Sequence, residues 1–268
     1  MRFSSLNFQE ISHVDMQERG FSYGDGHFTT ANIFKGKIQF LGAHLERLQQ
    51  GNKALFLGEV DWQKLASYVA DLAVSYSDGV LKIVITAGSG GRGYARNENV
   101  QPNVYVFVFD PVDHYVEWQR EGISVEVASF QLSDNPALVG IKHLNRLEQV
   151  LIRRELDTRG VHELLVTDLQ GHIVEASCSN VFWFDGKQWY TPSISCAGIA
   201  GIVRNELIKL LPDVKLVKSF IDELSGAQSM LVCNSVMRIV PVATFKGKSL
   251  DMAPVQDIIN RFELHANQ

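Results

Sequence analysis

The second half of the chain contains four strand-like runs that follow one another with only a few residues between them. They cover residues 163–168, 172–175, 181–184 and 188–191. Strands that are grouped in this way around a few helices, instead of alternating strictly with them, favour an α+β fold with mainly antiparallel sheets and flanking helices. Further runs with strand character are 3–8, 27–34, 80–87, 104–109, 123–130, 215–220, 229–233 and 238–244.

Helical periodicity is confined to four stretches. The clearest covers residues 62–76, where apolar side chains recur every three or four positions and form one face of a predicted helix. A second predicted helix begins near residue 42, a third covers about 145–159, and a fourth covers about 201–211. In the 145–159 helix, the side chains that we expect to face a core are Leu147, Val150, Leu151, Ile152 and Leu156.

A run of turn-forming residues interrupts the pattern between the two halves. Residues 110–114 read Asp-Pro-Val-Asp-His and lie between two strand-like runs. Because proline and aspartate in such a run break regular structure, we place a domain boundary here. The sequence predicts a small N-terminal α/β domain at residues 1–112 and a larger C-terminal domain at residues 113–268, which contains Lys142.

The charge balance excludes some classes of function. The chain has 25 Lys and Arg residues against 30 Asp and Glu residues, a net charge of −5. This gives no general attraction to nucleic acids or anionic membranes, so we expect neither as a partner. No apolar run approaches the ~20 residues that span a bilayer, and the N-terminal residues do not resemble a signal peptide. Three widely spaced cysteines, Cys178, Cys196 and Cys233, predict a reducing, cytoplasmic location and no metal site.

A glycine-rich loop imitates a nucleotide-binding motif. Residues 88–93 read Gly-Ser-Gly-Gly-Arg-Gly and satisfy the G-x-G-x-x-G pattern. That function needs the loop to open a helix, so that main-chain N–H groups and the helix dipole face the phosphates. Here the loop continues into a polar run that ends at Pro102, where no helix can begin easily. We therefore expect a mobile connection near a pocket, with Arg92 either in contact with a substrate carboxylate or simply solvated.

Three charged residues are candidates for chemistry, although each also has an ordinary structural explanation. Lys142 lies between a strand-like run and a helix with apolar neighbours, where burial favours the neutral, nucleophilic amine. Glu175 ends a strand, and Arg47 is one of several charges on its helix. Taken singly, such residues are more often solvated surface charges or caps of turns.

Six motifs occur in order along nearly the whole chain, and these three residues belong to them. The motifs are Tyr-Gly-Asp-Gly-x-Phe-Thr-Thr at residues 23–30, His-Leu-x-Arg-Leu at 44–48, Ile-Lys-His-Leu-Asn-Arg at 141–146, Glu-Ala-Ser-x-Ser-Asn-Val-Phe at 175–182, Thr-Pro at 191–192 and Gly-Ile-Ala-Gly-Ile-x-Arg at 198–204. This arrangement resembles the fold type IV enzymes that depend on pyridoxal 5′-phosphate (PLP). The resemblance implies a two-domain fold of the D-amino-acid aminotransferase type and a homodimer.

The resemblance also implies roles for individual residues. Lys142 forms the Schiff base with PLP and later transfers protons, and Glu175 contacts the pyridine nitrogen, so that the ring can accept electrons. Arg47 pairs with the cofactor phosphate. The remaining implied contacts are main-chain N–H groups of Ile199 and Ala200 at a helix start, Asn234 and Ser235 in a second phosphate loop, and Phe28, Thr30 and Arg92 near the substrate.

Within that family the chain is most similar to the aminodeoxychorismate lyases. The similarity is carried by residues 88–94 and by the string at residues 140–153. Aminotransferases place a tyrosine five residues after the lysine, where this chain has Leu147, and glycine-rich residues where it has Ala-Ser-Cys-Ser at 176–179. The resemblance therefore implies conversion of 4-amino-4-deoxychorismate to 4-aminobenzoate and pyruvate, in folate synthesis. The alternatives are an aminotransferase for D-amino or branched-chain amino acids, a Rossmann oxidoreductase and a non-catalytic binding module.

Overall fold

The computed structural model describes residues 1–98 and 101–266. Contacts between residues divide the chain into two compact units. The first comprises Met1–Val112 and Ile141–Asn145, and the second comprises Asp113–Gly140 and Arg146–Gln268. The segment around Lys142 therefore packs with the first unit, whereas we expected it in a domain formed by residues 113–268. Its place depends on pairing with a strand near the N-terminus, which local sequence patterns do not reveal.

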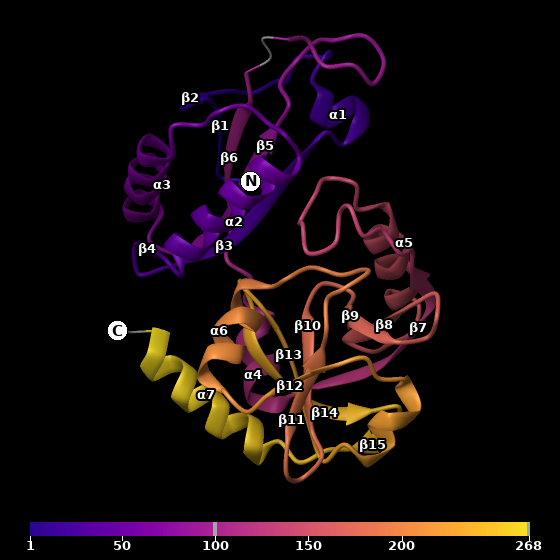
Figure 1. Cartoon of the computed structure of the whole chain (residues 1–268). Coiled ribbons are helices and arrows are strands. Elements are labelled where there is room, and N and C mark those ends of the chain that lie inside the picture. Colours follow the sequence, from indigo (N-terminus) through magenta and orange to yellow (C-terminus); the bar gives the residue numbers. More distant parts are fainter. Residues whose placement is uncertain (99–100, 267–268) are drawn as a thin grey trace. The chain divides into compact units, whose positions relative to one another are not determined.

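The first unit is built on one antiparallel sheet. Its strands are β1 (Phe3–Leu6), β2 (Gln9–Glu10), β3 (Gly26–Phe34), β4 (Lys37–Ile38), β5 (Gly79–Thr86) and β6 (Asn103–Phe109). Among the residues described, they pair in the order β2-β1-β6-β5-β3-β4. Helices α2 (Leu41–Ala54) and α3 (Trp62–Tyr76) bury Leu48 and Leu65 against one face of this sheet (Figure 1). A short helix, α1 (Arg19–Tyr23), precedes β3.

The second unit contains a larger mixed sheet. Its strands are β7 (Ile123–Leu132), β8 (Glu163–Asp168), β9 (Ile173–Ala176), β10 (Asn180–Phe184), β11 (Trp189–Pro192), β12 (Lys215–Val217), β13 (Ser229–Asn234), β14 (Arg238–Phe245) and β15 (Lys248–Ser249). In the described part of the chain their order is β12-β11-β10-β13-β14-β7-β8-β9, and β15 pairs with β14. The pairs β11–β12, β14–β7 and β7–β8 are parallel, and the others are antiparallel. The predicted α+β class with antiparallel-rich sheets is confirmed.

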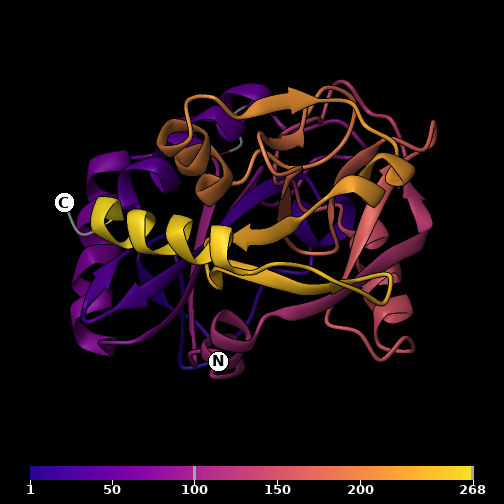
Figure 2. The same cartoon turned by 90° about the horizontal axis from the view of Figure 1, so that it is seen from below.

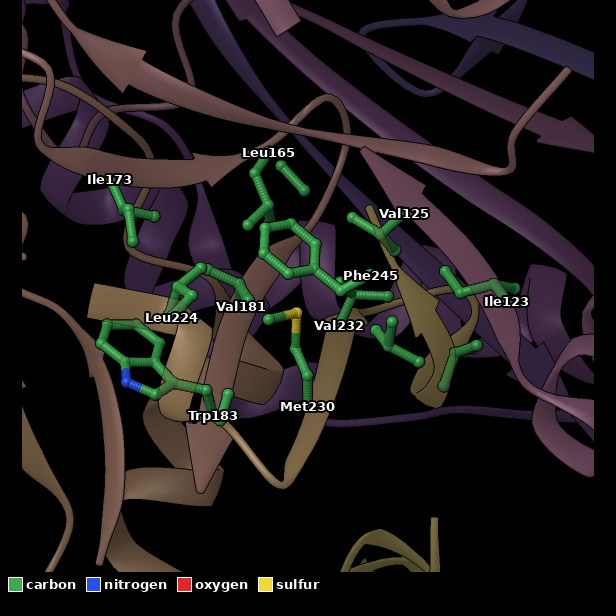
Figure 3. Packing of buried hydrophobic residues seen from close by; sticks show 14 of the residues in the cluster. Ile123, Val125, Leu165, Ile173, Val181, Trp183, Leu224, Met230, Val232 and Phe245 are labelled. Carbon is green, nitrogen blue, oxygen red and sulfur yellow. The ribbon is translucent and has the colours of Figure 1, made fainter. Parts of the chain in front are cut away.

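Helices flank this second sheet and close its core. They are α4 (His114–Glu121), α5 (Leu147–Leu156), α6 (Ile202–Leu210), the 3₁₀ helix η1 (Ile221–Gly226) and α7 (Ala253–Ala266). Helix α7 packs against β13, β14 and α6 (Figure 2). In the core, Met230 of β13 and Phe245 of β14 lie among Val181, Val232 and Leu165 (Figure 3). No helix of the described residues is both long enough and apolar enough to cross a membrane.

The apolar face predicted for α5 is only partly correct. Ile152 and Leu156, four residues apart, are 1% and 4% exposed and pack on β7 and β8. Leu147, Val150 and Leu151 instead are 71%, 60% and 43% exposed. The helix carries two adjacent apolar stripes, and only one of them meets the sheet, which periodicity alone cannot decide.

Candidate active site

Lys142 lies on a short segment that pairs with the beginning of β3. Its main-chain oxygen accepts a hydrogen bond from Phe28 N at 2.9 Å, and Leu144 N donates to Gly26 O at 3.0 Å. Glycine is needed at position 26, because a Cβ atom there would lie 2.4 Å from the main-chain oxygen of Ile85 on β5. The Gly-Asp-Gly motif thus allows β3 to accept the lysine segment on one side while it pairs with β5 on the other.

Two ammonium groups lie close to one aromatic ring of β3. Lys142 Nζ is 4.7 Å from the ring centroid of Phe28, and Lys82 Nζ is 5.0 Å from the same centroid. Thr30 is the direct cross-strand partner of Lys82 and shares the sheet face of Phe28, since side chains two apart on a strand point the same way. The structure thus brings Phe28, Thr30 and Lys142 to one region of the first unit.

Lys82 is a candidate that sequence reasoning missed. It is half-buried on β5, and burial lowers the pKa of its ammonium group. Among the described residues it has no carboxylate partner. The available signal was a single lysine inside the apolar run Val-Leu-Lys-Ile-Val-Ile, where a surface strand would carry several polar residues.

Arg47 lies on α2 and is half-buried, so it is not the fully solvated helix charge that its position alone would predict. Burial lowers the pKa of its guanidinium to about 10, and the group remains positively charged at neutral pH. His44, three residues earlier, is 1% exposed and hydrogen-bonds through Nδ1 to Thr29 Oγ1 of β3 at 2.6 Å. This bond attaches the helix that carries Arg47 to the strand that carries Phe28.

Glu175 lies on β9 in the second unit and is 5% exposed. Its Oε2 atom accepts a hydrogen bond from Ile199 N at 2.9 Å. The approach depends on Gly198, whose φ is +89° and where a Cβ atom would lie 2.6 Å from Val174 Cγ1. The main chain before α6 is therefore held directly against the strand that carries the carboxylate.

The main-chain N–H groups that we expected to bind a phosphate have protein acceptors in this structure. Ile199 N–H donates to Glu175, as described above, and Ala200 N–H donates to Gly140 O over a long 3.4 Å. Asn180 Nδ2 fixes the same turn through Ile199 O at 2.9 Å. The turn is a preformed helix start at Gly201, and its N–H groups are oriented by neighbouring strands.

Asn234 is the last residue of β13, and Ser235 begins the turn to β14. Asn234 Oδ1 accepts hydrogen bonds from Val236 N and Met237 N at 2.8 and 2.9 Å. Its Nδ2 atom donates to Cys178 O at 3.2 Å, which joins this turn to the loop after Glu175. The Asn234 side chain thus has a structural role at the position where we expected a phosphate contact.

A buried carboxylate that the sequence did not indicate organises that neighbouring loop. Glu163 is 3% exposed and accepts hydrogen bonds from Ser177 N and Ser179 Oγ, both at 3.0 Å. Cys178 Sγ lies 3.3 Å from Glu163 Oε2. Lone glutamates at a strand start have no distinctive sequence pattern, so this role becomes visible only in three dimensions.

The glycine loop does not open a helix in the described residues 88–98, as the sequence predicted. Arg92 is exposed at its tip. The guanidinium of Arg19 hydrogen-bonds to four main-chain oxygens of this loop.

The donor set of these residues fits PLP. The first unit supplies an amine that can bind an aldehyde, Lys142, and a cation for a phosphate, Arg47. The second unit supplies a buried carboxylate, Glu175, which suits a pyridine nitrogen. Within the described residues, no group of His, Cys, Asp and Glu side chains is arranged to hold a metal ion.

Comparison with known proteins agrees with this chemistry. The chain matches the model of the amino-transferase class IV family over residues 26–245. An aminodeoxychorismate lyase from Vibrio harveyi is 30% identical over 236 residues, which cover 87% of each chain. A D-alanine aminotransferase from Bacillus licheniformis is 25% identical and is matched over 84% of its length and 88% of this chain.

A solved structure is similar over almost the entire chain. The crystal structure of 4-amino-4-deoxychorismate lyase from Pseudomonas aeruginosa has a TM-score of 0.90 and 28% sequence identity. The match covers 96% of this chain and 98% of that one.

Proposed function

Because the chain belongs to the class IV amino-transferase family of PLP-dependent enzymes, we propose that it is a lyase that converts 4-amino-4-deoxychorismate to 4-aminobenzoate and pyruvate. We choose this substrate because the ammonium groups of Lys82 and Lys142 both lie at the ring of Phe28. Lys142 supplies the reactive amine, and Lys82 supplies a neighbouring cation for a carboxylate. The proposed substrate has two carboxylates, and Arg92 is the second cation proposed to bind one of them.

The reaction assigns distinct tasks to the residues of the chain. Bound PLP supplies an electron sink that is conjugated with the substrate amine. The amine of Lys142 removes the proton from the ring carbon that bears the substrate amine. The carbon–oxygen bond to the enolpyruvyl group then breaks, the ring becomes aromatic, and the released enolpyruvate takes up a proton to give pyruvate. Aromatisation makes this step favourable.

Glu175 and Arg47 act on the cofactor. The Glu175 carboxylate favours a proton on the pyridine nitrogen, because a buried negative charge stabilises an adjacent positive one. The guanidinium of Arg47 pairs with the phosphate, with N–H groups near Ile199 and Ala200 as further donors. Asn234 and Ser235 are proposed to support the phosphate through the turn that they form. Thr30 and Phe28 line the sheet face on which the substrate binds.

An aminotransferase for D-amino or branched-chain amino acids is the second candidate, and the similarity to a D-alanine aminotransferase favours it. It would use the same Lys142, Glu175 and Arg47. Leu147 argues against it, because this side chain has no hydroxyl where we expect the aminotransferases to have a tyrosine. The lyase also needs no second amino acceptor.

We further propose that the enzyme is a cytoplasmic homodimer that serves folate synthesis. The free cysteines Cys178, Cys196 and Cys233 suit a reducing compartment. The exposed side chains of Leu147, Val150 and Leu151 form an apolar stripe that a second copy would cover.

The test is incubation of the purified, PLP-loaded protein with 4-amino-4-deoxychorismate and detection of 4-aminobenzoate by its fluorescence. The wild-type protein should produce it, and the Lys142→Ala variant should not. Absence of product from a wild-type protein that contains PLP would reject the proposed lyase activity.

A further inference from the structure

The loop that contains Arg92 is folded around the guanidinium of Arg19. The side chain of Arg19 is 3% exposed, and among the described residues its Nη atoms donate to main-chain oxygens of the loop. The acceptors are Gly90 O, Gly93 O and Ala95 O for Nη1, at 3.3, 3.3 and 3.2 Å, and Tyr94 O for Nη2, at 3.1 Å. One planar cation therefore satisfies four carbonyl groups that would otherwise favour different loop conformations.

The main chain at residues 17–19, where α1 begins, holds the beginning of the same loop. Arg19 N donates to Gly88 O at 2.9 Å, and Gly90 N donates to Gln17 O at 3.1 Å. Glu18 and Ser89 form an isolated antiparallel bridge between these two bonds. The loop is thus paired along its first residues and wrapped around a buried cation along its later ones.

Glycine is required at one position of the loop for steric reasons. Gly91 has φ +86°, and a Cβ atom there would lie 2.3 Å from Ala95 O and 2.9 Å from Arg19 Nη1. Gly93 has φ +59°, but a Cβ atom there would meet no atom within 4 Å. We call the Arg19 guanidinium and the four loop carbonyl groups around it the guanidinium cage. A methyl group at position 91 would collide with this cage, whereas one at position 93 would not.

Asp25 fixes the orientation of Arg19. Its carboxylate accepts a hydrogen bond from Arg19 Nε at 2.8 Å and another from Arg96 Nε at 2.9 Å. Burial disfavours the charge of Asp25, but the hydrogen bonds from Arg96 and Arg19 outweigh it and lower the pKa of the carboxyl group. Arg96 Nη1 also donates to Leu55 O and Phe56 O, at 2.9 and 3.0 Å.

The same turn that carries Asp25 also holds the lysine segment. Gly24 O accepts a hydrogen bond from Asn145 Nδ2 at 3.2 Å, and Gly26 O accepts one from Leu144 N at 3.0 Å. The side chain of Asp25 faces the arginines, while the carbonyl groups of its neighbours face the segment of Lys142. The loop and the lysine segment therefore share one rigid support.

We infer that Arg19 is a positioning residue: it holds the glycine loop in a single conformation, so that Arg92 at the tip meets a carboxylate of an anionic substrate at a fixed place. This inference rests on the proposed function for the identity of the substrate. Arg92 lies between Gly91 and Gly93, and the cage fixes the main chain on both sides of it. A preorganised cation loses little conformational entropy when the substrate binds.

The ordering of the loop can be measured without any turnover. Hydrogen exchange in peptides that cover residues 88–98 of the PLP-loaded protein should be at least about 10-fold faster in Arg19→Met than in wild type. Arg19→Lys keeps the charge beside Asp25 but not the planar fork, so it should exchange as fast as Arg19→Met. In both variants Asp25 still forms its ion pair with Arg96, so the buried carboxylate keeps a partner and the protein is expected to fold. Wild-type exchange in Arg19→Met would overturn the inference.

Gly91→Ala disturbs the cage from the loop side and leaves Arg19 and Asp25 in place, so it should reproduce the faster exchange. Gly93→Ala is the control for backbone strain, because both glycines have a positive φ but the methyl group at position 93 meets open space, so its exchange should rise clearly less than that of Gly91→Ala. Equal exchange in both alanine variants would contradict the cage.

The effect on the substrate is tested by kinetics and by a double mutant. Arg19→Met, Gly91→Ala and Arg92→Ala should each raise KM for 4-amino-4-deoxychorismate about 10- to 100-fold, with kcat changed less than about 3-fold. Because Arg19 acts through Arg92, combining Arg19→Met with Arg92→Ala should raise KM no further. The PLP dissociation constant should be unchanged in all of them.

Two outcomes separate this inference from the proposed function. An additive double mutant, or a loosened loop with unchanged KM, would reject the link from Arg19 through Arg92 to the substrate. A wild-type protein without lyase activity would reject the proposed function and the substrate contact of Arg92 with it. In that case the exchange data would still decide whether Arg19 orders the loop.

Discussion

Three carboxylates that are largely shielded from solvent have neighbouring groups that compensate their charge. Glu163 has hydroxyl and N–H donors, Asp25 has two arginines, and Glu175 has the N–H of Ile199. A buried carboxylate without such partners would take up a proton. The candidate residues should therefore be tested with substitutions that keep the shape of the side chain wherever one exists.

Lys142 is expected to be the residue that binds PLP covalently. Lys142→Ala should lose the visible absorbance of the covalently bound cofactor and nearly all turnover, because no other amine is held by the same segment. Lys82→Met is the matched control at the same aromatic ring, and it should keep that absorbance. If Lys142→Ala retains the absorbance, another lysine binds the cofactor.

Glu175→Gln should change reactivity more than cofactor affinity. The amide keeps the size of the side chain and can still accept the N–H of Ile199, but it carries no negative charge to favour a proton on the pyridine nitrogen. We expect PLP to remain bound and proton removal to slow by about 100-fold, equivalent to a few kcal/mol of barrier. Single-turnover rates measure this, and wild-type rates would exclude the pyridine contact.

Arg47→Ala should act mainly on cofactor affinity. Loss of a charge-assisted contact to a phosphate raises a dissociation constant about 10- to 100-fold. The control is Lys53→Ala, which removes an exposed cation from the same helix α2. A PLP titration measures the dissociation constants of both variants. Equal constants would show that Arg47 does not contact the phosphate.

At the scale of elements, α2 and β3 are joined by two buried polar pairs. Thr29 Oγ1 and His44 Nδ1 are 2.6 Å apart, and His27 Nε2 and Asn52 Oδ1 are 2.7 Å apart. Burial first, and the charge of Arg47 second, lower the pKa of His44 to about 3. The helix that carries the proposed phosphate contact is thus attached by a histidine that is neutral in the folded protein.

This pairing predicts an acid-sensitive stability. His44 takes up a proton at pH ~6.5 in the unfolded chain but only near pH 3 in the folded one, so the unfolded state binds more protons between these values. His44 should therefore lower the free energy of unfolding by up to about 1.4 kcal/mol for each pH unit below 6.5. Urea unfolding from pH 7 to pH 4 measures the slope. His44→Gln should reduce it, and an unchanged slope would contradict the assignment to His44.

Elements with a strong local pattern were predicted well. The helix at Trp62–Tyr76 and the strand at Glu163–Asp168 have the bounds that periodicity indicated. Helix α1 has five residues, too few for a period, and α4 buries none of its side chains. Helix α7 was missed although Val255, Ile258 and Phe262 recur at helical spacing and are buried. Helix α4 also has apolar side chains at helical spacing, Tyr115 and Trp118, which are partly buried against the core of the second unit, whereas α1 is too short for such a signal.

The sequence indicated a candidate site residue only where that residue belongs to one of the family motifs. Lys142, Glu175 and Arg47 follow from such motifs. Lys82 and Arg19 do not. Lys82 has only the signal of a single lysine in an apolar run, and what makes Arg19 distinctive is contributed by residues far away in the sequence, because it contacts carbonyl groups more than 70 positions away. Pairing partners of this kind leave no trace in local composition or periodicity.

At the scale of the whole chain, the candidate residues are divided between two units with separate cores. Lys142 and Arg47 belong to the first unit, and Glu175 and Asn234 belong to the second. Each unit closes its own apolar cluster around its own sheet. The roles proposed above for Lys142, Arg47, Glu175 and Asn234 therefore draw on residues of both units.

The lyase and the aminotransferase differ in what happens to the electron pair that remains on the substrate after the proton is removed. Both begin with binding of an amine and removal of a proton by Lys142, so cofactor binding cannot separate them. A transaminase transfers the amino group to the cofactor and needs a keto acid to recover it. In the lyase the electrons form the aromatic ring as the enolpyruvyl group leaves, and the cofactor is unchanged after each cycle. Leu147 and the ordered loop that presents Arg92 favour the second course.

We therefore expect one pyruvate for each 4-aminobenzoate, no requirement for a keto acid and no accumulation of the amine form of the cofactor. Pyruvate is measured by a coupled dehydrogenase, 4-aminobenzoate by fluorescence and the cofactor by its absorbance in the same reaction. D-Alanine and leucine, supplied alone, serve as controls and should leave the cofactor spectrum unchanged. Rapid conversion of the cofactor to its amine form with either amino acid, without pyruvate from 4-amino-4-deoxychorismate, would assign the chain to the aminotransferases instead.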